Sequence, residues 1–563
     1  MPRSATQPDH PVIETHLAGY QLLADPLLNK GTAFSEDERD EFDLHGLLPP
    51  HTAQMQEQVA RRVQALRAMP DDLARQVFLR EIQESNETLY YAILNTNLEE
   101  WLPVVHVPTV ALACQNFSRQ YRRPRGLFLS YPQRDQMAKM LSQPHLDQIE
   151  AIVVSDGERI LGLGDHGANG MAIPIGGASL LSACAGLNPA AVLPILLDMG
   201  TDSRACLQDP LYVGWRHERV RGPAYDQFIA DFVVIVRERW PHIVLQWEDL
   251  AQHNAARLLN QYRGELCTFN DNIQGTATVA LATLISALRV NGGLLAQQRI
   301  VIFGAGSAGT GIAQLLVASM MADGLSLEAA RSNIWMIDRS GLLFEGENQS
   351  GFGRPASEWP QRHDGGVVQL RAVIDQCKPT VLIGTSGQAG AFDEAAIRAM
   401  AAYCLRPVIL PLSNPTSHCE ATPADLLKWT NGQALIGTGS PFAPVTYQNQ
   451  RHNITQTNNA YVFPGLTLGA IAVKARGISD GMLLRAADTL ARLTAPATTG
   501  QGLLPPINSL HDVACKVAVA VAEQAITEGL ADADPLIDVA KRIQKQIWAP
   551  HYKTFRRLYR AMA

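Results

Sequence analysis

The sequence has little positive charge with which to attract nucleic acid or an anionic membrane. Its 563 residues include 47 Lys and Arg against 54 Asp and Glu, which gives a formal net charge of -7 at pH 7 and a pI near 6.1. Proteins that bind a phosphate backbone or an anionic bilayer through charge need clustered Lys and Arg. We therefore expect no nucleic-acid and no membrane partner, and we expect small molecules and other subunits instead.

The sequence also lacks a membrane-spanning run, a secretory signal and paired cysteines. No uninterrupted apolar run reaches membrane-spanning length, since the Ala/Val-rich segment 513–522 is short and contains Lys516. The first ten residues have no apolar core of a signal peptide, which predicts a cytoplasmic location. The eight cysteines include no Cys-x-x-Cys pair and mostly lie in apolar surroundings, so we interpret them as reduced core residues.

The composition is that of a globular protein with more than one domain. Hydrophobic residues make up 46% and charged residues 18%, and 563 residues are too many for a single core. Within 52–97, apolar residues such as Met55, Val59, Val63 and Leu66 recur at steps of three and four, which predicts a helical N-terminal region. Farther along, short apolar strands alternate with helical segments. This alternation predicts an α/β fold with parallel sheets covered by helices.

A glycine-rich turn follows one of the predicted strands. The apolar segment 299–303 leads directly into a turn that contains Gly304, Gly306 and Gly309, and a helical pattern follows over 310–321. In this context the glycines let the backbone approach a pyrophosphate, and the helix N-terminus supplies oriented N–H groups. The sequence therefore predicts a Rossmann-like dinucleotide-binding domain.

The choice of dinucleotide depends on two adjacent residues. Asp338 closes the next predicted strand, where a carboxylate can accept hydrogen bonds from the adenosine ribose, and this favours NAD. Arg339 follows it, and a guanidinium beside the ribose could tolerate the 2′-phosphate of NADP.

Two adjacent carboxylates end another predicted strand. Glu248 and Asp249 follow the apolar segment 243–247, at the sheet edge where open α/β sheets bind ligands. Carboxylate oxygens are the ligands that Mg²⁺ and Mn²⁺ prefer. In isolation such a pair is more often a solvated strand end, so the metal interpretation depends on the motifs around it.

Several motifs are spread along the chain: Thr109-Val110, Asp156-Gly-Glu-Arg-Ile-Leu-Gly-Leu-Gly-Asp165, Asp209-Pro-Leu-Tyr-Val-Gly-Trp-Arg216, Trp247-Glu-Asp-Leu250, Cys267-Thr-Phe-Asn-Asp-Asn-Ile-Gln-Gly-Thr276, Gly304-Ala-Gly-Ser-Ala-Gly309 and Ser386-Gly-Gln388. Together they resemble the malic enzyme family, and in detail its bacterial NAD-dependent branch. The resemblance implies an NAD-dependent oxidoreductase that uses Mg or Mn, oxidatively decarboxylates malate or a related 2-hydroxy acid, and forms a homo-oligomer, a dimer or a tetramer.

The resemblance also implies roles for individual residues. Arg159 matches the arginine that holds a substrate carboxylate, which a planar fork of donors suits well. Asn414 and Asn458 match asparagines on the substrate and nicotinamide side. The implied metal ligands are Glu248, Asp249 and Asn272, and the implied catalytic residues are Asp271 and His106.

Three positions depart from the family's pattern. His106 stands where the family has a catalytic tyrosine, Gly177 where it has a catalytic lysine, and Asn272 where it has a metal-binding aspartate. Glycine cannot carry a proton. His106 could, and we weigh a catalytic and a structural role for it equally. His166 is a weaker candidate, and Asn272 predicts weaker metal binding.

These departures leave two alternatives open. One is a lyase or decarboxylase with a changed substrate, in which Gly177 makes room for an extra substituent. The other is a catalytically impaired paralogue that binds NAD or dicarboxylates. In all cases we expect the same division of the chain: a helical N-terminal region (1–125), a substrate and metal domain (126–275, completed by 458–530), a Rossmann-like NAD-binding domain (276–457) and a C-terminal helical tail (531–563).

Overall fold

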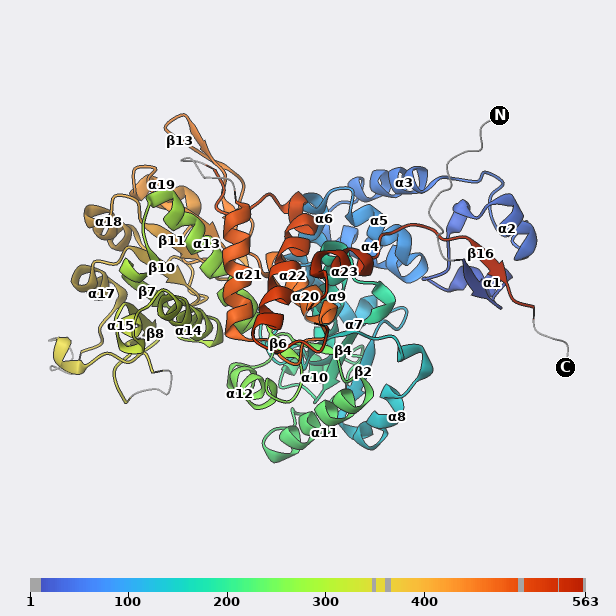
Figure 1. The fold of residues 1–563 in the computed structure, drawn as a ribbon, viewed down its shortest axis with the longest axis horizontal. Helices are drawn as coiled ribbons and strands as arrows, with labels where there is room; N and C mark the ends of the chain where they lie inside the picture. The colour runs from blue at the N-terminus through green and yellow to red at the C-terminus, as the bar shows by residue number, and fades with distance from the viewer. Residues whose placement is uncertain (1–11, 347–350, 360–365, 495–500, 535, 560–563) are drawn as a thin grey trace. The chain divides into compact units, whose positions relative to one another are not determined.

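The computed structural model describes residues 12–346, 351–359, 366–494, 501–534 and 536–559, which group into two compact units (Figure 1). Of the described residues, the first unit contains 12–105, 120–125 and 548–559, and the second contains those of 106–119 and 126–547. The predicted α/β fold, with a helical N-terminal region, parallel sheets and a Rossmann-like part, is confirmed. These two units do not coincide with the four segments predicted from the sequence, and that four-part division stays a prediction.

The first unit is mainly helical and has one small sheet. Ser35 and Glu38 cap the start of α2 reciprocally, which satisfies two backbone N–H groups at the helix end. Strand β1 pairs in parallel with β16, so segments more than 500 residues apart in the chain lie side by side. The elements are β1 (Ile13–Thr15), α1 (Gly19–Ala24), α2 (Glu36–Glu41), α3 (Met55–Arg67), α4 (Asp72–Ser85), α5 (Glu87–Leu94), α6 (Leu98–Val105) and β16 (Phe555–Arg557).

The second unit contains a five-stranded parallel sheet in the order β2-β4-β3-β5-β6. Its central strands are buried apolar runs, as expected of a parallel sheet that helices cover on both faces. The strands are β2 (Leu127–Ser130), β3 (Ala151–Ser155), β4 (Val192–Asp198), β5 (Val244–Trp247) and β6 (Thr268–Asn270); the helices are α7 (Thr109–Gln120), α8 (Met137–Leu141), α9 (Ala172–Ala185), α10 (Arg204–Gln208), α11 (Pro223–Arg239) and α12 (Gln252–Tyr262).

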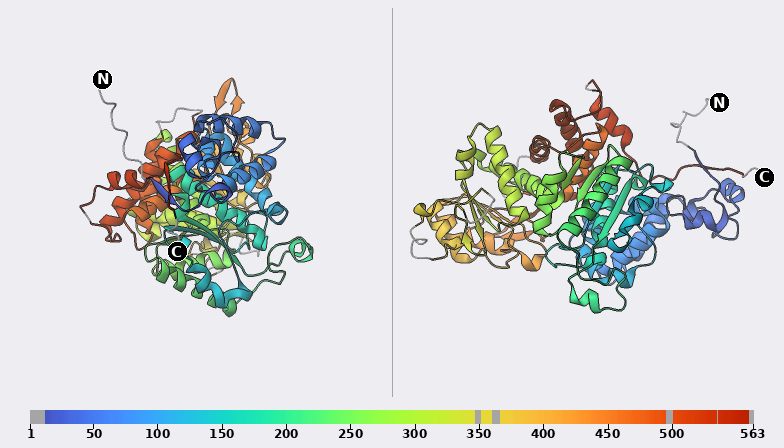
Figure 2. Two further views of the ribbon diagram at one scale, coloured as in Figure 1. Left: turned by 90° about the vertical axis from the view of Figure 1, so that its right-hand side faces the viewer. Right: turned by 90° about the horizontal axis from the view of Figure 1, so that it is seen from below.

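The same unit contains a seven-stranded sheet in the order β15-β12-β11-β10-β7-β8-β9. All its pairs are parallel except β8 with the edge strand β9. The sheet lies in the yellow-green to orange part of the ribbon in Figure 2. The strands are β7 (Ile300–Phe303), β8 (Ile334–Asp338), β9 (Gly341–Leu342), β10 (Val381–Gly384), β11 (Val408–Pro411), β12 (Leu435–Thr438) and β15 (Thr455–Gln456), with a hairpin of β13 (Val445–Tyr447) and β14 (Gln450–His452); the helices are α13 (Thr276–Asn291), α14 (Ser307–Ala322), α15 (Leu327–Ser332), α17 (Leu370–Cys377), α18 (Glu394–Tyr403) and α19 (Pro423–Trp429).

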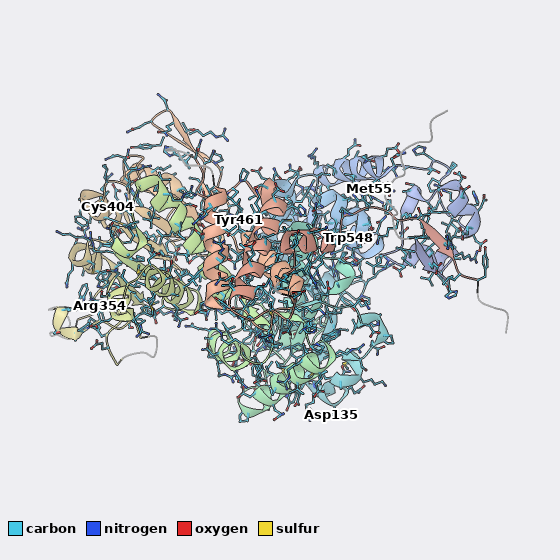
Figure 3. The ribbon with its side chains drawn as sticks, in the orientation of Figure 1. Met55, Asp135, Arg354, Cys404, Tyr461 and Trp548 are labelled. Atoms are coloured by element: carbon cyan, nitrogen blue, oxygen red, sulfur yellow. The ribbon has the colours of Figure 1, made fainter. Side chains whose placement is uncertain are left out.

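Beyond β15 the chain returns to the first of these sheets. Helices α20 (Phe463–Ala472) and α22 (Leu510–Thr527) pack against α9, while α21 (Asp480–Leu493) packs against α13 and α22, and α23 (Val539–Gln546) against α20 and α22. Tyr461, labelled in Figure 3, is buried just before α20, and its hydroxyl donates a hydrogen bond to the carbonyl of Pro505.

Two helical segments among the described residues are long and apolar enough to cross a membrane. They are 167–185, which ends in α9, and 271–291, which ends in α13. The apolar window of the first is 100% buried in the unit and that of the second 78%. A helix that is apolar on all sides is stable when a protein core surrounds it, so both segments have the character of core helices.

Candidate active site

A cavity of about 280 Å³ lies where strands of both large sheets end. Loops that follow β5, β6, β7, β10, β11 and β12 contribute to its wall. This is the carboxyl edge of the strands, where open α/β sheets bind ligands. Among the predicted site residues, those that line the cavity are His106, Arg159, Glu248, Asp249, Asp271, Asn272, Gly306, Asn414 and Asn458.

Two of the three predicted glycines are required by the turn itself. Gly304 has a φ of +120°, and a Cβ there would approach the backbone of Thr385 to 2.6 Å. A Cβ on Gly309 would lie 1.9 Å from the carbonyl oxygen of Gly304. Both contacts are too short for any side chain, so these positions admit only glycine.

Gly306 and Asp338 differ from these two glycines, because no contact within the described part of the protein requires glycine at 306 or aspartate at 338. A Cβ on Gly306 would meet only the side chain of Gln252, at 3.8 Å. Gly306 is the N-cap residue of α14 and lines both the cavity described above and a second one, of about 420 Å³. Asp338 is exposed at the end of β8, where its carboxylate accepts a hydrogen bond from the backbone of Arg339. Both residues present their polar or backbone atoms to space that a ligand can enter.

Three buried carboxylates also line the cavity, and each accepts a hydrogen bond from a side-chain amide. Glu248 accepts from Gln246 at 2.6 Å, Asp249 from Asn272 at 2.8 Å, and Asp271 from Asn459 at 2.7 Å. The three carboxylates are between 3% and 7% exposed. Neutral amides therefore satisfy this acidic cluster in part.

Burial raises the pKa of all three carboxyl groups, and repulsion from nearby carboxylates adds to the effect. The pKa of Glu248 is well above its ordinary value because the group is buried and because Asp271 and Asp249 lie near. Burial raises the pKa of Asp249 to about 6 and that of Asp271 to about 7. Arg159 acts in the opposite direction on Asp249. Near neutral pH Asp249 and Asp271 thus exchange protons readily, which is the property expected of groups that move protons in a reaction.

Asp271 is the carboxylate best placed to act on a ligand. Its Oδ2 is held by Asn459, while its Oδ1 is buried with no hydrogen-bond partner among the described residues. A Cβ on Gly275 would lie 1.9 Å from that Oδ1, so glycine at 275 is what allows the carboxylate its position. The segment 271–275 is a single π-helical turn that continues into α13. An unpaired acceptor in a cavity wall is free to take a proton from a bound molecule.

His106 lines the cavity but is a poor proton carrier. Burial lowers the pKa of its imidazole to about 4, so the ring is neutral at pH 7. Only about one molecule in a thousand carries the extra proton three pH units above the pKa, and efficient acid–base catalysts have pKa values near the working pH. Its Nδ1 has no partner among the described residues. The geometry therefore favours a role in hydrogen bonding to a ligand.

Gly177 lies in the buried helix α9 and is not part of the cavity wall. A Cβ there would approach the Cγ1 atom of Val153 in β3 to 3.1 Å. This tight packing gives no support to the idea that Gly177 makes room for a larger substrate. His166, the weaker candidate, is half-buried and also lies outside this wall.

The predicted substrate residues differ in how free they are. Arg159 is exposed, and among the described residues its guanidinium makes only one hydrogen bond, a long one of 3.5 Å to Gln252, so it can turn toward an anion. Asn414 accepts a hydrogen bond from Ser440 at 2.6 Å. The Asn458 carbonyl caps the following turn by accepting from the backbone of Ala460.

Two residues of the site were not predicted. Asn459 is the amide that holds Asp271, and only its position next to Asn458 in the motif could have drawn attention to it. Glu420 is fully buried and accepts hydrogen bonds from the Ser386 and Ser413 hydroxyls and from the Ser386 backbone, at 2.5–2.9 Å. It thereby ties together the two cavity loops that follow β10 and β11. A lone Glu in the loop after β11 gives no such signal in the sequence.

Comparisons with known proteins agree with this architecture. A model of the malic enzyme N-terminal domain matches residues 83–263, and a model of the malic enzyme NAD-binding domain matches 273–526. The chain is 47% identical over 551 residues to an NAD-dependent malic enzyme of Vibrio campbellii, and 48% identical over 549 residues to one of Pseudomonas savastanoi pv. phaseolicola; each alignment covers 96% of this chain and 97% of the relative.

A solved structure shows the same fold at lower sequence identity. The crystal structure of the malic enzyme of Entamoeba histolytica matches with a TM-score of 0.56 and 21% identity, over 90% of this chain and 91% of that one. Because the two family models together span most of the chain and its relatives are nearly half identical along almost its whole length, the chain belongs to the malic enzyme family.

Proposed function

We propose that the chain is an NAD-dependent oxidoreductase that oxidatively decarboxylates malate or a related 2-hydroxy acid. One observation carries the proposal: the same cavity is lined by Gly306 of the dinucleotide turn, by Arg159 and by Asp271. A nicotinamide, a substrate carboxylate and a proton acceptor would thus meet in one place. The name of the relatives, NAD-dependent malic enzyme, supports the same reaction.

The residues described support the hydride-transfer step most directly. Arg159 would hold a carboxylate of the substrate, and Asp271 would take the proton of the 2-hydroxyl group through its unpaired Oδ1. The hydrogen on C2 then leaves as hydride to the nicotinamide, so that the hydroxy acid becomes a 2-oxo acid and NAD becomes NADH. Asn414 and Asn458 would position the substrate and the nicotinamide. His106 would donate or accept a hydrogen bond as a neutral imidazole.

The divalent metal expected from the resemblance fits these residues poorly. Glu248 and Asp249 offer suitable oxygen atoms, but the side chain of Asn272 is engaged at both ends with Asp249. Among the described residues, no three His, Cys, Asp or Glu side chains form a metal-binding group. We therefore assign no reaction step to a metal.

A panel of 2-hydroxy acids tests the proposal. NADH formation, followed by its absorbance, is expected with malate or a close relative and is expected to fall at least tenfold in Arg159→Lys, which keeps the charge but loses the planar fork. Calorimetry with both dinucleotides checks the cofactor: because Asp338 would repel a 2′-phosphate, NAD should bind more tightly than NADP. If NAD binds but no acid in the panel yields NADH, the oxidoreductase proposal fails.

That failure would select the second candidate, a paralogue that binds NAD and dicarboxylates without turnover. The observation in its favour is the state of the two proton-carrier positions, since His106 is neutral at pH 7 and Gly177 has no side chain. Equilibrium binding of malate in the presence of NAD, with no NADH formed, is its signature. Light scattering would test the proposed homo-oligomer under the same conditions.

A further inference from the structure

The orientation of the Asn272 side chain is fixed by its two hydrogen bonds to Asp249. The Asn272 Oδ1 accepts from the backbone N–H of Asp249 at 2.8 Å, and the Asn272 Nδ2 donates to the Asp249 Oδ1 at 2.8 Å. A backbone N–H can only donate and an ionised carboxylate can only accept. Exchanging the amide oxygen and nitrogen of Asn272 would place two donors face to face and two acceptors face to face, so only the observed orientation satisfies both contacts.

This orientation makes Asn272 a poor ligand for a cation beside Asp249. Its single oxygen already accepts from the Asp249 backbone, and its NH₂ group faces the Asp249 carboxylate, from which it would repel a cation. The other Asp249 oxygen, Oδ2, accepts from the backbone of Leu161 at 3.0 Å. Both carboxylate oxygens of Asp249 are thus already engaged by N–H donors of the protein.

The neighbouring carboxylates repeat the arrangement. Glu248 and Asp271 each accept a hydrogen bond from a side-chain amide, that of Gln246 and that of Asn459 respectively. Glu248 and Asp249 are consecutive, and neutral N–H donors engage one oxygen of Glu248 and both oxygens of Asp249. A divalent cation would have to displace such bonds and would find no third anionic ligand at position 272.

We infer that the carboxamide of Asn272 stands in for a divalent cation beside Asp249, so that this member of the malic enzyme family holds no Mg²⁺ or Mn²⁺ at Glu248 and Asp249. A single atom of difference, nitrogen for oxygen, converts a ligand of the cation into its replacement. The inference concerns binding and stability, so it does not depend on whether the protein turns over malate.

Mn²⁺ binding measured by electron paramagnetic resonance and by calorimetry tests the inference on the full chain. The wild-type protein should show no saturable Mn²⁺ site at millimolar metal, whereas Asn272→Asp should bind Mn²⁺ at least tenfold more tightly. Without metal, Asn272→Asp should have a lower Tm than wild type, because two buried carboxylates then face each other, and Mn²⁺ should restore that Tm.

The exchanged pair Asp249→Asn/Asn272→Asp is the matched control. It carries the same number of carboxylates as wild type and restores an amide–carboxylate pair with the donor on the other side. Its Tm without metal should return close to that of wild type, and its Mn²⁺ binding should be as weak. This variant remains informative even where Asn272→Asp alone fails to fold.

Three results would overturn the inference. A saturable, micromolar Mn²⁺ site in the wild type would mean that Asn272 does not exclude the cation. Equal Mn²⁺ affinity in wild type and Asn272→Asp would mean that residue 272 does not control the site. Tight Mn²⁺ binding by the exchanged pair would mean that Glu248 and other groups hold the metal without Asp249.

Discussion

The glycine-rich turn at 304–309 and the acidic cluster around Asp249 line the same cavity, but different kinds of contact determine their structures. In the turn, backbone contacts set the residue type: a Cβ at Gly304 or Gly309 would lie closer to neighbouring backbone atoms than any side chain allows. In the acidic cluster, side chains do the work, and Asn272 and Asp249 are held only by hydrogen bonds. Adding one atom, a Cβ, would therefore disrupt the turn by steric clash. Exchanging one atom in the cluster, oxygen for nitrogen, would change its charge and hydrogen bonding without requiring the backbone to move. The two regions can diverge at different rates within one cavity.

Removing the proposed proton acceptor, Asp271, should have the largest effect, and it should lower catalysis without changing NAD binding. Asp271→Asn is expected to lower the kcat for NADH formation about 10²–10⁴-fold, the usual contribution of a positioned acid or base. The dissociation constant of NAD, measured by calorimetry, should stay within about twofold, because Asp271 is not part of the dinucleotide turn. A matching loss of NAD affinity would show that the two regions are not separable.

The reverse result, an effect on the glycine-rich turn and on NAD binding, is expected from Gly309→Ala. The added Cβ would lie 1.9 Å from the Gly304 carbonyl oxygen, so the turn must distort, with a stability cost of about 3 kcal/mol and loss of NAD binding. Urea unfolding and calorimetry measure the two effects. Gly306→Ala is the control: its Cβ has room within the protein, so stability should be unchanged while NAD affinity falls. Equal destabilisation by both variants would contradict the steric account of the turn.

Glu420 offers an intermediate effect, because it links the loops that line the cavity and touches neither ligand in the proposed arrangement. Glu420→Gln replaces an acceptor oxygen by a donor in front of Ser386 and Ser413, at a stability cost of about 1–3 kcal/mol. We expect kcat to fall about tenfold, with a smaller change in KM, because the two loops would no longer be held in fixed positions relative to each other. Ser386→Ala, which removes one donor only, should have a weaker effect. A stability loss with unchanged kcat would make Glu420 purely structural.

The smallest effect concerns His106 and acidic pH. The folded-state pKa of about 4 lies below the ordinary value of 6.5, so the unfolded chain binds the extra proton first as the pH falls. Wild type should therefore lose about 1–2 kcal/mol of stability from this group between pH 7.5 and pH 5, where His106→Gln should not. Urea unfolding of both proteins at the two pH values gives the difference. If the stabilities of the two proteins change equally with pH, then the pKa of His106 is the same in the folded and unfolded states.

Local patterns in the sequence predicted the fold and the turn, because those depend on residues close together in the chain. The strand before Gly304 and the helix after Gly309 are contiguous with the glycines, and the structure has them as β7 and α14. The partner of Asp271 is Asn459, 188 residues away, and that of Ser386 is Glu420, in another loop. Such pairs arise only when strands assemble into a sheet.

Side-chain chemistry was harder to predict, because it depends on burial. His106 has the ordinary features of a proton carrier in the sequence, but burial lowers the pKa of the imidazole far below neutrality. Asn272 was expected to be a weaker ligand, and only its two contacts with Asp249 reveal that its oxygen is already occupied. Residue type alone did not specify either property.

The pairing of β1 with β16 has a consequence for synthesis on the ribosome. Ile13–Thr15 emerges early, but its partner strand Phe555–Arg557 is translated more than 500 residues later. Domains usually fold in the order in which they are made. In this chain β1 has no partner strand until the whole second unit, which ends at residue 547, has been translated. The part of the protein that is made first is therefore finished last, and a ribosome stalled before residue 555 carries an N-terminal unit whose sheet cannot close.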